Sequence, residues 1–195
     1  MEPTARRPYD LDTLLDVAAE VFNARGYDGT SMGDLATALG ISKSSIYHHV
    51  ASKEALLALA VDRALSALFD VLDEPAALDG RARDQVEHVL RRSVQVLDEE
   101  LRFVTLLLRV RGNTATERDA LERRRSFDRQ VTALVEQAMA DGDLRADLDP
   151  ALVTRLLFGT VNSLVEWYLP EHGDADAVAD TLVAMVFDGL DSRGA

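Results

Sequence analysis

Cationic side chains that could bind a polyanion gather in one short segment of this sequence. The only two lysines, Lys43 and Lys53, lie within residues 30–53, where the only acidic residue is Asp34. Serine, tyrosine and histidine side chains, which can donate hydrogen bonds, lie between these lysines. Ammonium groups beside such donors are the chemistry that binds phosphate oxygens and base edges. The segment therefore indicates nucleic-acid binding.

No set of residues points to catalysis or to a metal site. The absence of cysteine removes thiolate nucleophiles, thiolate zinc sites and disulfides, and it fits a reducing compartment. The four histidines, His48, His49, His88 and His172, are scattered except for one adjacent pair. Adjacent side chains on a helix point about 100° apart, so this pair is poorly placed to share a metal. We expect no catalytic residue, no metal and no cofactor.

The overall charge opposes DNA binding, but its distribution favours it. The formal net charge is −13 at pH 7, and neutralisation of phosphates dominates affinity for DNA. The excess of acids lies outside the cationic segment, while Arg6 and Arg7 precede the first expected helix. We expect a small cationic face on an acidic body, which binds DNA only where that face fits.

The elements that position these residues are expected to be helices. Of the 195 residues, 47% are hydrophobic, and their spacing is helical with no alternating strand pattern. No leader or apolar run of about 18 residues is present, so we expect a soluble cytoplasmic protein with no membrane partner. The predicted fold class is all-α with about nine helices. The expected helices are roughly residues 12–25, 31–39, 42–49, 52–72, 81–98, 100–111, 115–140, 150–169 and 174–191.

Residues 29–56 have the pattern of a helix-turn-helix. Ser31 and Ser42 are expected N-caps of two short helices, and Gly40 between them supplies the freedom for a sharp turn. Ile41 is expected to fill the corner. Because the helix after the turn is short and polar on its outer face, it can enter the major groove of DNA, which is about 12 Å wide.

This segment, GTSMGDLATALGISKSSIYHHVASKEAL, resembles the TetR family of transcriptional regulators. The resemblance covers roughly residues 14–65, and its most specific part is ATALGISKSSIYHHVASKEALL; Val50 stands where the family more often has phenylalanine. It implies three parts: a helix-turn-helix DNA-binding domain at residues 1–52, a connecting helix at residues 53–72, and a ligand-binding and dimerisation domain at residues 73–195.

The resemblance and the chemistry together imply a set of DNA contacts. The start of the recognition helix reaches phosphates and base edges, and the two N-terminal arginines reach the minor groove. The expected contacts are Thr30, Ser31, Ser42, Lys43, Ser44, Ser45, Tyr47, His48 and Lys53, with Arg6 and Arg7. Simpler roles stay open: the serines as caps only, Tyr47 as a half-buried core aromatic, Lys53 as a solvated lysine, and the arginines as an ordinary terminus.

The last two expected helices each carry two apolar lines, which calls for two partners. One partner is the protein's own core, and the other is the same pair of helices in a second subunit. The expected interface residues are Val153, Leu157, Val161, Leu164, Leu182, Met185 and Val186. A dimer would place two recognition helices about 34 Å apart, as a pseudo-palindromic operator requires. The alternative is a thick monomer core.

The segments RVRGNT, ADLDP and EWYLP resemble the branch of the TetR family that senses acyl-CoA thioesters. This resemblance implies an apolar slot for the acyl group and arginines for the CoA phosphates. The expected ligand-binding residues are Phe103, Leu107, Arg109, Arg111, Arg124, Trp167 and Tyr168. The alternative is that these are surface charges and ordinary core residues.

These expectations predict a dimeric repressor, not an enzyme, that a small hydrophobic ligand releases from its operator. A tilt of the connecting helix would change the separation of the two recognition helices. A regulator of efflux or drug-response genes that senses a hydrophobic or cationic drug is the first alternative. A helical protein-interaction adaptor is the second, but it would not need the Lys43 and Tyr47 arrangement.

Overall fold

The computed structural model describes residues 10–171 and 173–190, with the side chains of residues 188–190 left aside, and the fold is all-α as expected. Arg6 and Arg7 lie outside the described residues. No helix in the described part is long and apolar enough to cross a membrane. The elements are α1 (Leu11–Arg25), α2 (Met32–Leu39), α3 (Lys43–Tyr47), α4 (Lys53–Asp73), α5 (Pro75–Leu78), α6 (Ala82–Glu99), α7 (Leu101–Arg109), α8 (Ala115–Ala140), α9 (Pro150–Ser163), the 3₁₀ turn η1 (Leu164–Glu166) and α10 (Ala175–Leu190).

Polar caps fix the ends of the short N-terminal helices. At α2 the Ser31 Oγ accepts from the backbone N–H of Asp34 (3.2 Å), while the Asp34 carboxylate accepts from the N–H of Ser31 (2.8 Å). Gly40 ends α2 at a φ of 66°, a left-handed conformation that glycine adopts without a Cβ clash. The Ser42 Oγ caps α3 by accepting from the N–H of Ser45 (3.1 Å). These caps produce the sharp turn between α2 and α3.

Three expected helices end earlier than predicted, and one of them is α7, which ends at Arg109 and not at residue 111. α3 ends at Tyr47 because the N–H of His49 bonds to the carbonyl of Ile46, which tightens the chain into a turn. α9 ends at Ser163 and continues only as η1. The single turn α5 lies within the stretch that was expected to be a loop.

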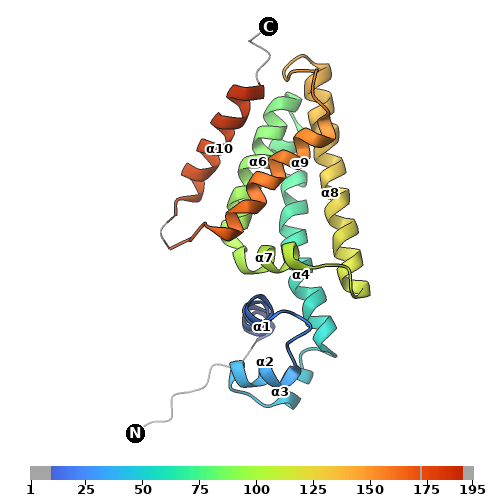
Figure 1. The fold of residues 1–195 in the computed structure, drawn as a ribbon, viewed down its shortest axis with the longest axis vertical. Helices are drawn as coiled ribbons and strands as arrows, with labels where there is room; N and C mark the ends of the chain where they lie inside the picture. The colour runs from blue at the N-terminus through green and yellow to red at the C-terminus, as the bar shows by residue number, and fades with distance from the viewer. Residues whose placement is uncertain (1–9, 172, 191–195) are drawn as a thin grey trace.

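Helices α1, α2 and α3 form a cluster at one end of the molecule, and α4 runs from this cluster into the rest of the structure (Figure 1). Phe22, Leu35 and Ile46, one from each helix, are fully buried in it. Leu56 in the first turn of α4 is also fully buried. Because burial of such a side chain contributes about 1.5–3 kcal/mol, α4 is an integral part of this N-terminal core.

In the larger part of the molecule α6 and α8 pack against α4, α9 packs against α8 and α6, and α10 packs against α6 (Figure 1). Phe69 of α4, Phe127 of α8 and Phe158 of α9 form an edge-to-face series, with ring centroids 5.8 Å and 5.2 Å apart. Such pairs add to the apolar burial. The series marks where the three helices meet.

Helix α7 lies between the two parts and is bonded to α1 at both of its ends. The side-chain amide of Asn23 donates to the backbone carbonyl of Arg102 (2.7 Å), and the backbone carbonyl of Asn23 accepts from the Arg109 guanidinium (2.6 Å). Arg102 also pairs with Asp16 and Glu20 of α1 at 3.2 Å and 3.4 Å. A shift of α7 would therefore strain these contacts with α1.

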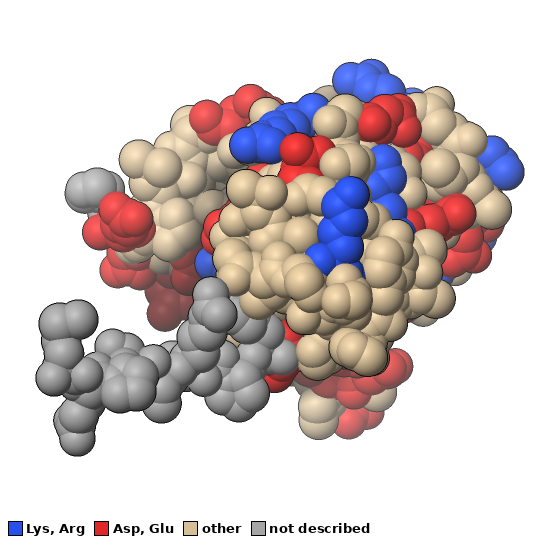
Figure 2. Space-filling view, turned by 90° about the horizontal axis from the view of Figure 1, so that it is seen from below, with Lys and Arg blue, Asp and Glu red and all other residues tan. Residues whose placement is uncertain are grey.

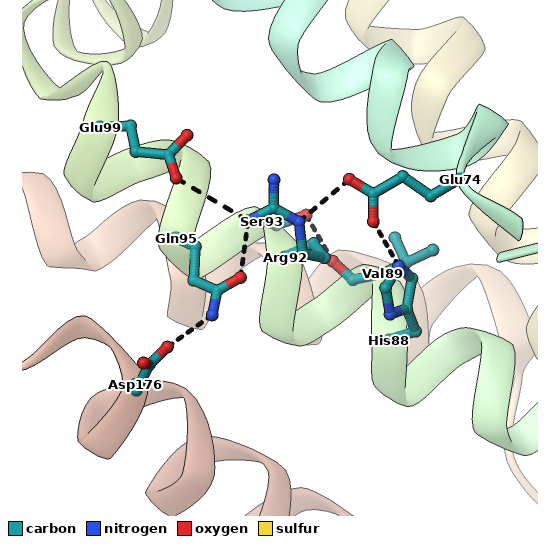
Figure 3. A network of polar contacts seen from close by, with 8 residues as sticks. All are labelled: Glu74, His88, Val89, Arg92, Ser93, Gln95, Glu99 and Asp176. Carbon is teal, nitrogen blue, oxygen red and sulfur yellow. Dashed lines mark hydrogen bonds and ion pairs between the residues drawn. The ribbon is translucent and has the colours of Figure 1, made fainter. Parts of the chain in front are cut away.

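A polar network joins the end of α4 to α6 and α10 (Figure 3). The Glu74 carboxylate accepts from His88 Nε2 (2.6 Å) and from Arg92 Nε (3.0 Å). Arg92 also donates to Gln95 (2.6 Å), whose amide donates to Asp176 at the start of α10. One chain of polar contacts thus ties the connecting helix to the last helix of the fold.

Candidate DNA interface and ligand cavity

The outer face of α3 presents polar side chains to solvent. Ile46 is fully buried against the N-terminal core, while Lys43, Ser44 and His48 are exposed. Tyr47 has an exposed fraction of 52%, so it is not a core aromatic. The structure therefore brings these four expected contact residues onto one accessible surface.

Charge on this end of the molecule agrees with a DNA-facing role. Seen from the α2–α3 end, the surface nearest the viewer is mostly uncharged and crossed by a strip of basic side chains, while most acids lie toward the edges (Figure 2). The Lys43 side chain crosses the start of α2, and a Cβ on Gly33 would lie 2.9 Å from its Cε. The absence of a side chain at Gly33 leaves room for this lysine.

All four of the expected serine contacts also make hydrogen bonds within the local fold. The Ser42 Oγ lies 2.7 Å from the Ser44 Oγ and 2.8 Å from the Ser45 Oγ, so the hydroxyls cluster at the start of α3. Ser31 is exposed and donates to the Asp34 carboxylate (2.6 Å). Hydrogen bonds from Ser31 hold the pKa of the Asp34 carboxyl below its ordinary value, and this carboxylate pairs with the Arg25 guanidinium at 3.5 Å.

Thr30 and Lys53 do not have the surroundings that the sequence suggested. Thr30 is buried, and its hydroxyl donates to the carbonyl of Gly26 (2.7 Å). The Lys53 ammonium donates to the carbonyls of Tyr27 and Thr30, both at 2.8 Å, and lies 4.1 Å from the Tyr27 ring centroid. The Thr30 hydroxyl is therefore held within the α1–α2 connector, whereas the Lys53 ammonium joins that connector to the start of α4.

A cavity of about 230 Å³ lies between α4, α6, α7, α8 and α9. Its wall is mostly apolar, and charged groups lie only on its α8 and α9 side. The apolar lining is Leu65, Leu68, Leu97, Val104, Leu107, Leu108, Phe127, Phe158 and Val161, and the remaining lining residues are Ser93, Arg124, Asp128, Arg155, Gly159 and Asn162. Such a cavity suits a small apolar ligand that carries a polar group.

Three charged residues lie on that side: Arg124 and Asp128 of α8, and Arg155 of α9. Desolvation raises the pKa of the Asp128 carboxyl and lowers the pKa of the Arg124 guanidinium. Arg124 and Arg155 both partly offset that rise at Asp128. Asp128 and Arg155 are nevertheless exposed and Arg124 is partly buried, so the three charges interact electrostatically where the cavity meets solvent.

The structure brings two of the seven expected ligand residues, Leu107 and Arg124, into the cavity. Phe103 is buried beneath the Arg63 guanidinium (4.5 Å), and Tyr168 is buried with its hydroxyl donating to Asp98 (2.8 Å). Both are therefore core residues here. The exposed Arg109 and Arg111 lie outside the cavity lining, as does Trp167.

Sequence reasoning missed the cavity residues of α9. Arg155, Gly159 and Asn162 follow a helical spacing of four and three residues, which places them on one face. Asp128 follows Arg124 by four residues on α8 in the same way. A search for polar residues repeated at this spacing within apolar helices could have found them.

The expected interface residues divide between the core and the surface. Val153, Leu157 and Val161 are buried in the protomer's own core and are not available to a second subunit. The exposed apolar side chains of this region are instead Leu152, Leu156, Trp167, Leu169 and Met185. Leu164 and Leu182 are largely buried, but with Met185 they line a shallow hollow of about 370 Å³ between α9 and α10. Val186 packs partly buried against the core.

Comparison with known proteins assigns both parts of the chain. Residues 14–60 match the family described as bacterial regulatory proteins, tetR family, and residues 79–190 match a family described as Tetracyclin repressor-like, C-terminal domain. Over 183 residues the chain is 32% identical to the HTH-type transcriptional repressor KstR2 of Rhodococcus jostii strain RHA1. That match covers 92% of this chain and 90% of KstR2.

Solved structures show the same fold. SCO3833 of Streptomyces coelicolor A3, a member of the TetR regulator family, is 56% identical with a TM-score of 0.87, and the match covers 97% of this chain and 94% of that chain. AibR, solved in complex with isovaleryl coenzyme A and operator DNA, has a TM-score of 0.78 at 22% identity, covering 90% and 97% of the two chains. Within the described residues, no group of side chains could hold a metal ion.

Proposed function

This chain belongs to the TetR family of transcriptional regulators, and from that premise we propose that it represses transcription as a dimer on a pseudo-palindromic operator. Its ligand is an acyl-CoA thioester, whose small apolar acyl group binds the cavity, and this binding releases the protein from DNA. The site of action is the cytoplasm, where a bacterial regulator meets its DNA.

Operator contact is supported by the outward face of α3. Lys43 and Ser44 at its start reach base edges and phosphates, and Tyr47 and His48 at its end donate to the flanking backbone. The buried Ile46 and Val50 hold the helix on its platform. Ser31 at the start of α2 adds a further phosphate contact.

Dimerisation is supported by the exposed apolar face of α9 and α10. Leu156 and Met185 have exposed fractions of 63% and 62%, and Trp167, the residue that follows η1, has an exposed fraction of 61%. Large apolar side chains grouped on one face favour a protein partner. A second copy would bury them and would place two copies of α3 about one helical turn of DNA apart.

The observation that carries the effector proposal is the cavity of apolar walls with two arginines on one side. An acyl group gains by leaving water for the leucine and phenylalanine wall. The two positive charges of Arg124 and Arg155 and the one negative charge of Asp128 sum to one net positive charge at the cavity. This charge favours an anionic ligand over a cationic drug. The efflux alternative is therefore less well supported.

Cavity size limits the buried part of the ligand. A cavity of 150 Å³ holds benzene, so the 230 Å³ cavity here holds an apolar group of roughly nine heavy atoms. An octanoyl group has about this size. The much larger CoA part would remain outside the apolar slot, beside the arginines.

Two helices can carry the signal from this cavity to α1–α3. α4 contributes Leu65 and Leu68 to the wall and continues into the N-terminal core. α7 contributes Val104 and Leu107 to the wall, and its opposite side is bonded to Asn23 of α1. A ligand that displaces both helices would reorient α3 relative to its partner copy.

Fluorescence anisotropy with labelled DNA from upstream of the gene tests this proposal. We expect the wild-type protein to bind this DNA, and octanoyl-CoA to weaken that binding. The apolar cation tetraphenylphosphonium, used as the control, is expected to have no effect. Release by tetraphenylphosphonium but not by octanoyl-CoA would favour drug sensing, and failure to bind any upstream DNA would favour the adaptor.

A further inference from the structure

We propose that Arg124 and Arg155 clamp an anionic oxygen group of the effector and that Asp128 is the internal carboxylate with which this group competes. Asp128 is then a residue that sets the affinity and the charge selectivity of the cavity. This inference rests on the proposed function, since it concerns the ligand of the same cavity.

The first support is the unusual state of these two arginines. In residues 10–171 and 173–190, every arginine side chain except those of Arg111, Arg124 and Arg155 makes a hydrogen bond or an ion pair. The chain has 34 acidic residues against 21 basic ones, so carboxylate partners are abundant. Two of the three arginines without a partner line the same cavity.

The second support is the arrangement around them. Arg124 and Asp128 lie one turn apart on α8, and Arg155 lies on α9, the helix that packs against α8. Asp128 interacts electrostatically with both arginines, but the described residues show no ion pair within 4.0 Å between Asp128 and either of them. Each guanidinium therefore keeps its donors available for another acceptor.

Arginine donors in this position suit an anion. A guanidinium binds carboxylate and phosphate oxygens through two parallel hydrogen bonds, and such bonds are stronger than neutral ones. Partial desolvation, which lowers the pKa of Arg124 and raises that of Asp128, strengthens the attraction of an anion to Arg124, while the exposed Arg155 offers a second guanidinium on the solvent side of the cavity. An arriving anion gains both arginines but is repelled by Asp128.

The apolar floor beneath the clamp defines the rest of the ligand. Phe127 directly precedes Asp128 on α8, and Phe158 lies about one turn after Arg155 on α9. The centroids of the two rings are 5.2 Å apart. A ligand with an apolar body and an anionic end fits this arrangement. The anion can be the carboxylate of a free acid or a phosphate of CoA, and the two sources are separable by experiment.

Isothermal titration calorimetry on the full chain tests the clamp with four probes: octanoate, octanoyl-CoA, CoA alone and the neutral 1-octanol. We expect Asp128→Asn to bind the clamped anionic probe about tenfold more tightly and Arg155→Gln to bind it about tenfold more weakly. Neither variant should change the binding of octanol. Arg111→Gln, which removes an arginine outside the cavity lining, is the matched control and should match the wild type.

The probes separate the possible outcomes. Tight binding of octanoate would assign the anion to a carboxylate, whereas binding of octanoyl-CoA with little binding of octanoate would assign it to CoA. The clamp would be overturned if 1-octanol bound as tightly as the anionic probes and if Asp128→Asn bound the anionic probes no more tightly than the wild type. This outcome would leave the apolar effector site intact. Binding of none of the four probes would contradict both the clamp and the proposed effector class. Thermal unfolding of each variant confirms that it is folded.

Discussion

Lys43 and Lys53 belong to the same sequence motif but have different surroundings in the fold. Lys43 is exposed at the start of α3, whereas the Lys53 ammonium donates to two backbone carbonyls. The sequence predicted a DNA contact for both because each begins a helix near the turn. The acceptors of Lys53 lie 23 and 26 residues away in sequence, so only the packing of the α1–α2 connector could reveal its role.

Replacing Lys43 by alanine should weaken operator binding by about 1–3 kcal/mol and reduce its salt dependence by about one phosphate contact. Anisotropy titrations at several salt concentrations measure both effects. Arg145→Ala removes an exposed cation that pairs with Asp147 and lies far from α3 in the sequence. It should leave the operator affinity and its salt dependence unchanged. Equal losses in the two variants would mean that overall charge, not α3, governs binding.

Replacing Lys53 by methionine should act on folding. The substitution keeps most of the side chain's volume but removes the ammonium donor from two carbonyls. The Tyr27 carbonyl still accepts from the N–H of Thr30 (3.2 Å), whereas the Thr30 carbonyl loses the donor that Lys53 supplies. An unsatisfied buried polar group costs about 1–3 kcal/mol, so the free energy of unfolding in urea should fall by this order. A variant of wild-type stability whose operator affinity drops with a reduced salt slope would instead restore Lys53 as a phosphate contact.

At the scale of the helix, the sequence predicted most elements but not the direction of every face. Helical spacing and caps at Ser31 and Ser42 placed the helices. Two apolar lines on α9 were also evident, yet hydrophobicity alone does not say which one faces the core. The structure buries the line of Val153 and Leu157, because that line meets α8, and it leaves Leu152 and Leu156 exposed.

The junction of α4 with α6 should make stability depend on acid pH. Desolvation of Glu74 opposes its ionisation, but hydrogen bonds from Arg92 and His88 outweigh this and hold the pKa of Glu74 below its ordinary value of 4.5. A carboxyl whose pKa is lowered on folding stabilises the fold above the ordinary value and loses this contribution as the pH falls through the folded pKa. Stability should therefore decline below about pH 4.5 in part through Glu74.

Thermal unfolding between pH 6 and pH 3 checks this expectation. Glu74→Gln should lower the Tm near pH 6 and should flatten its decline toward pH 3. Glu136→Gln, at an exposed site without a hydrogen bond or ion pair to any described residue, should keep the wild-type profile. The account of this junction fails if both variants show the same pH profile as the wild type.

For the whole molecule, the end that holds α3 presents polar side chains to solvent, and one side of the larger part exposes apolar ones. The acidic chain keeps its α2–α3 end largely uncharged with a basic strip (Figure 2), and the exposed apolar residues of α9 and α10 lie on the larger part. The sequence predicted a small cationic face on an acidic body and a second apolar line on each of the last two helices. It also predicted an apolar slot with arginines, but of the expected residues only Leu107 and Arg124 line the cavity, because its wall forms where five helices meet and cannot be read from any single segment.

Replacing Leu156 by glutamate should convert the dimer to a monomer, because it places a charge in the centre of an apolar contact. Sedimentation velocity measures the change in mass, and operator affinity should fall with it since one half-site contact is lost. Leu78→Glu alters an equally exposed leucine on α5, away from this face, and should remain dimeric. A Leu156→Glu dimer of normal operator affinity would exclude this face as the interface.

The measurement that bears most directly on the whole account is the reciprocal linkage between effector and operator. Octanoyl-CoA affinity is measured by calorimetry with and without saturating operator DNA, and operator affinity by anisotropy with and without saturating octanoyl-CoA. Because coupling is a property of the pair, both affinities should fall by the same factor, of the order of 5–150. Octanoyl-CoA that binds equally well to the free and the DNA-bound protein would contradict control of operator binding through the cavity.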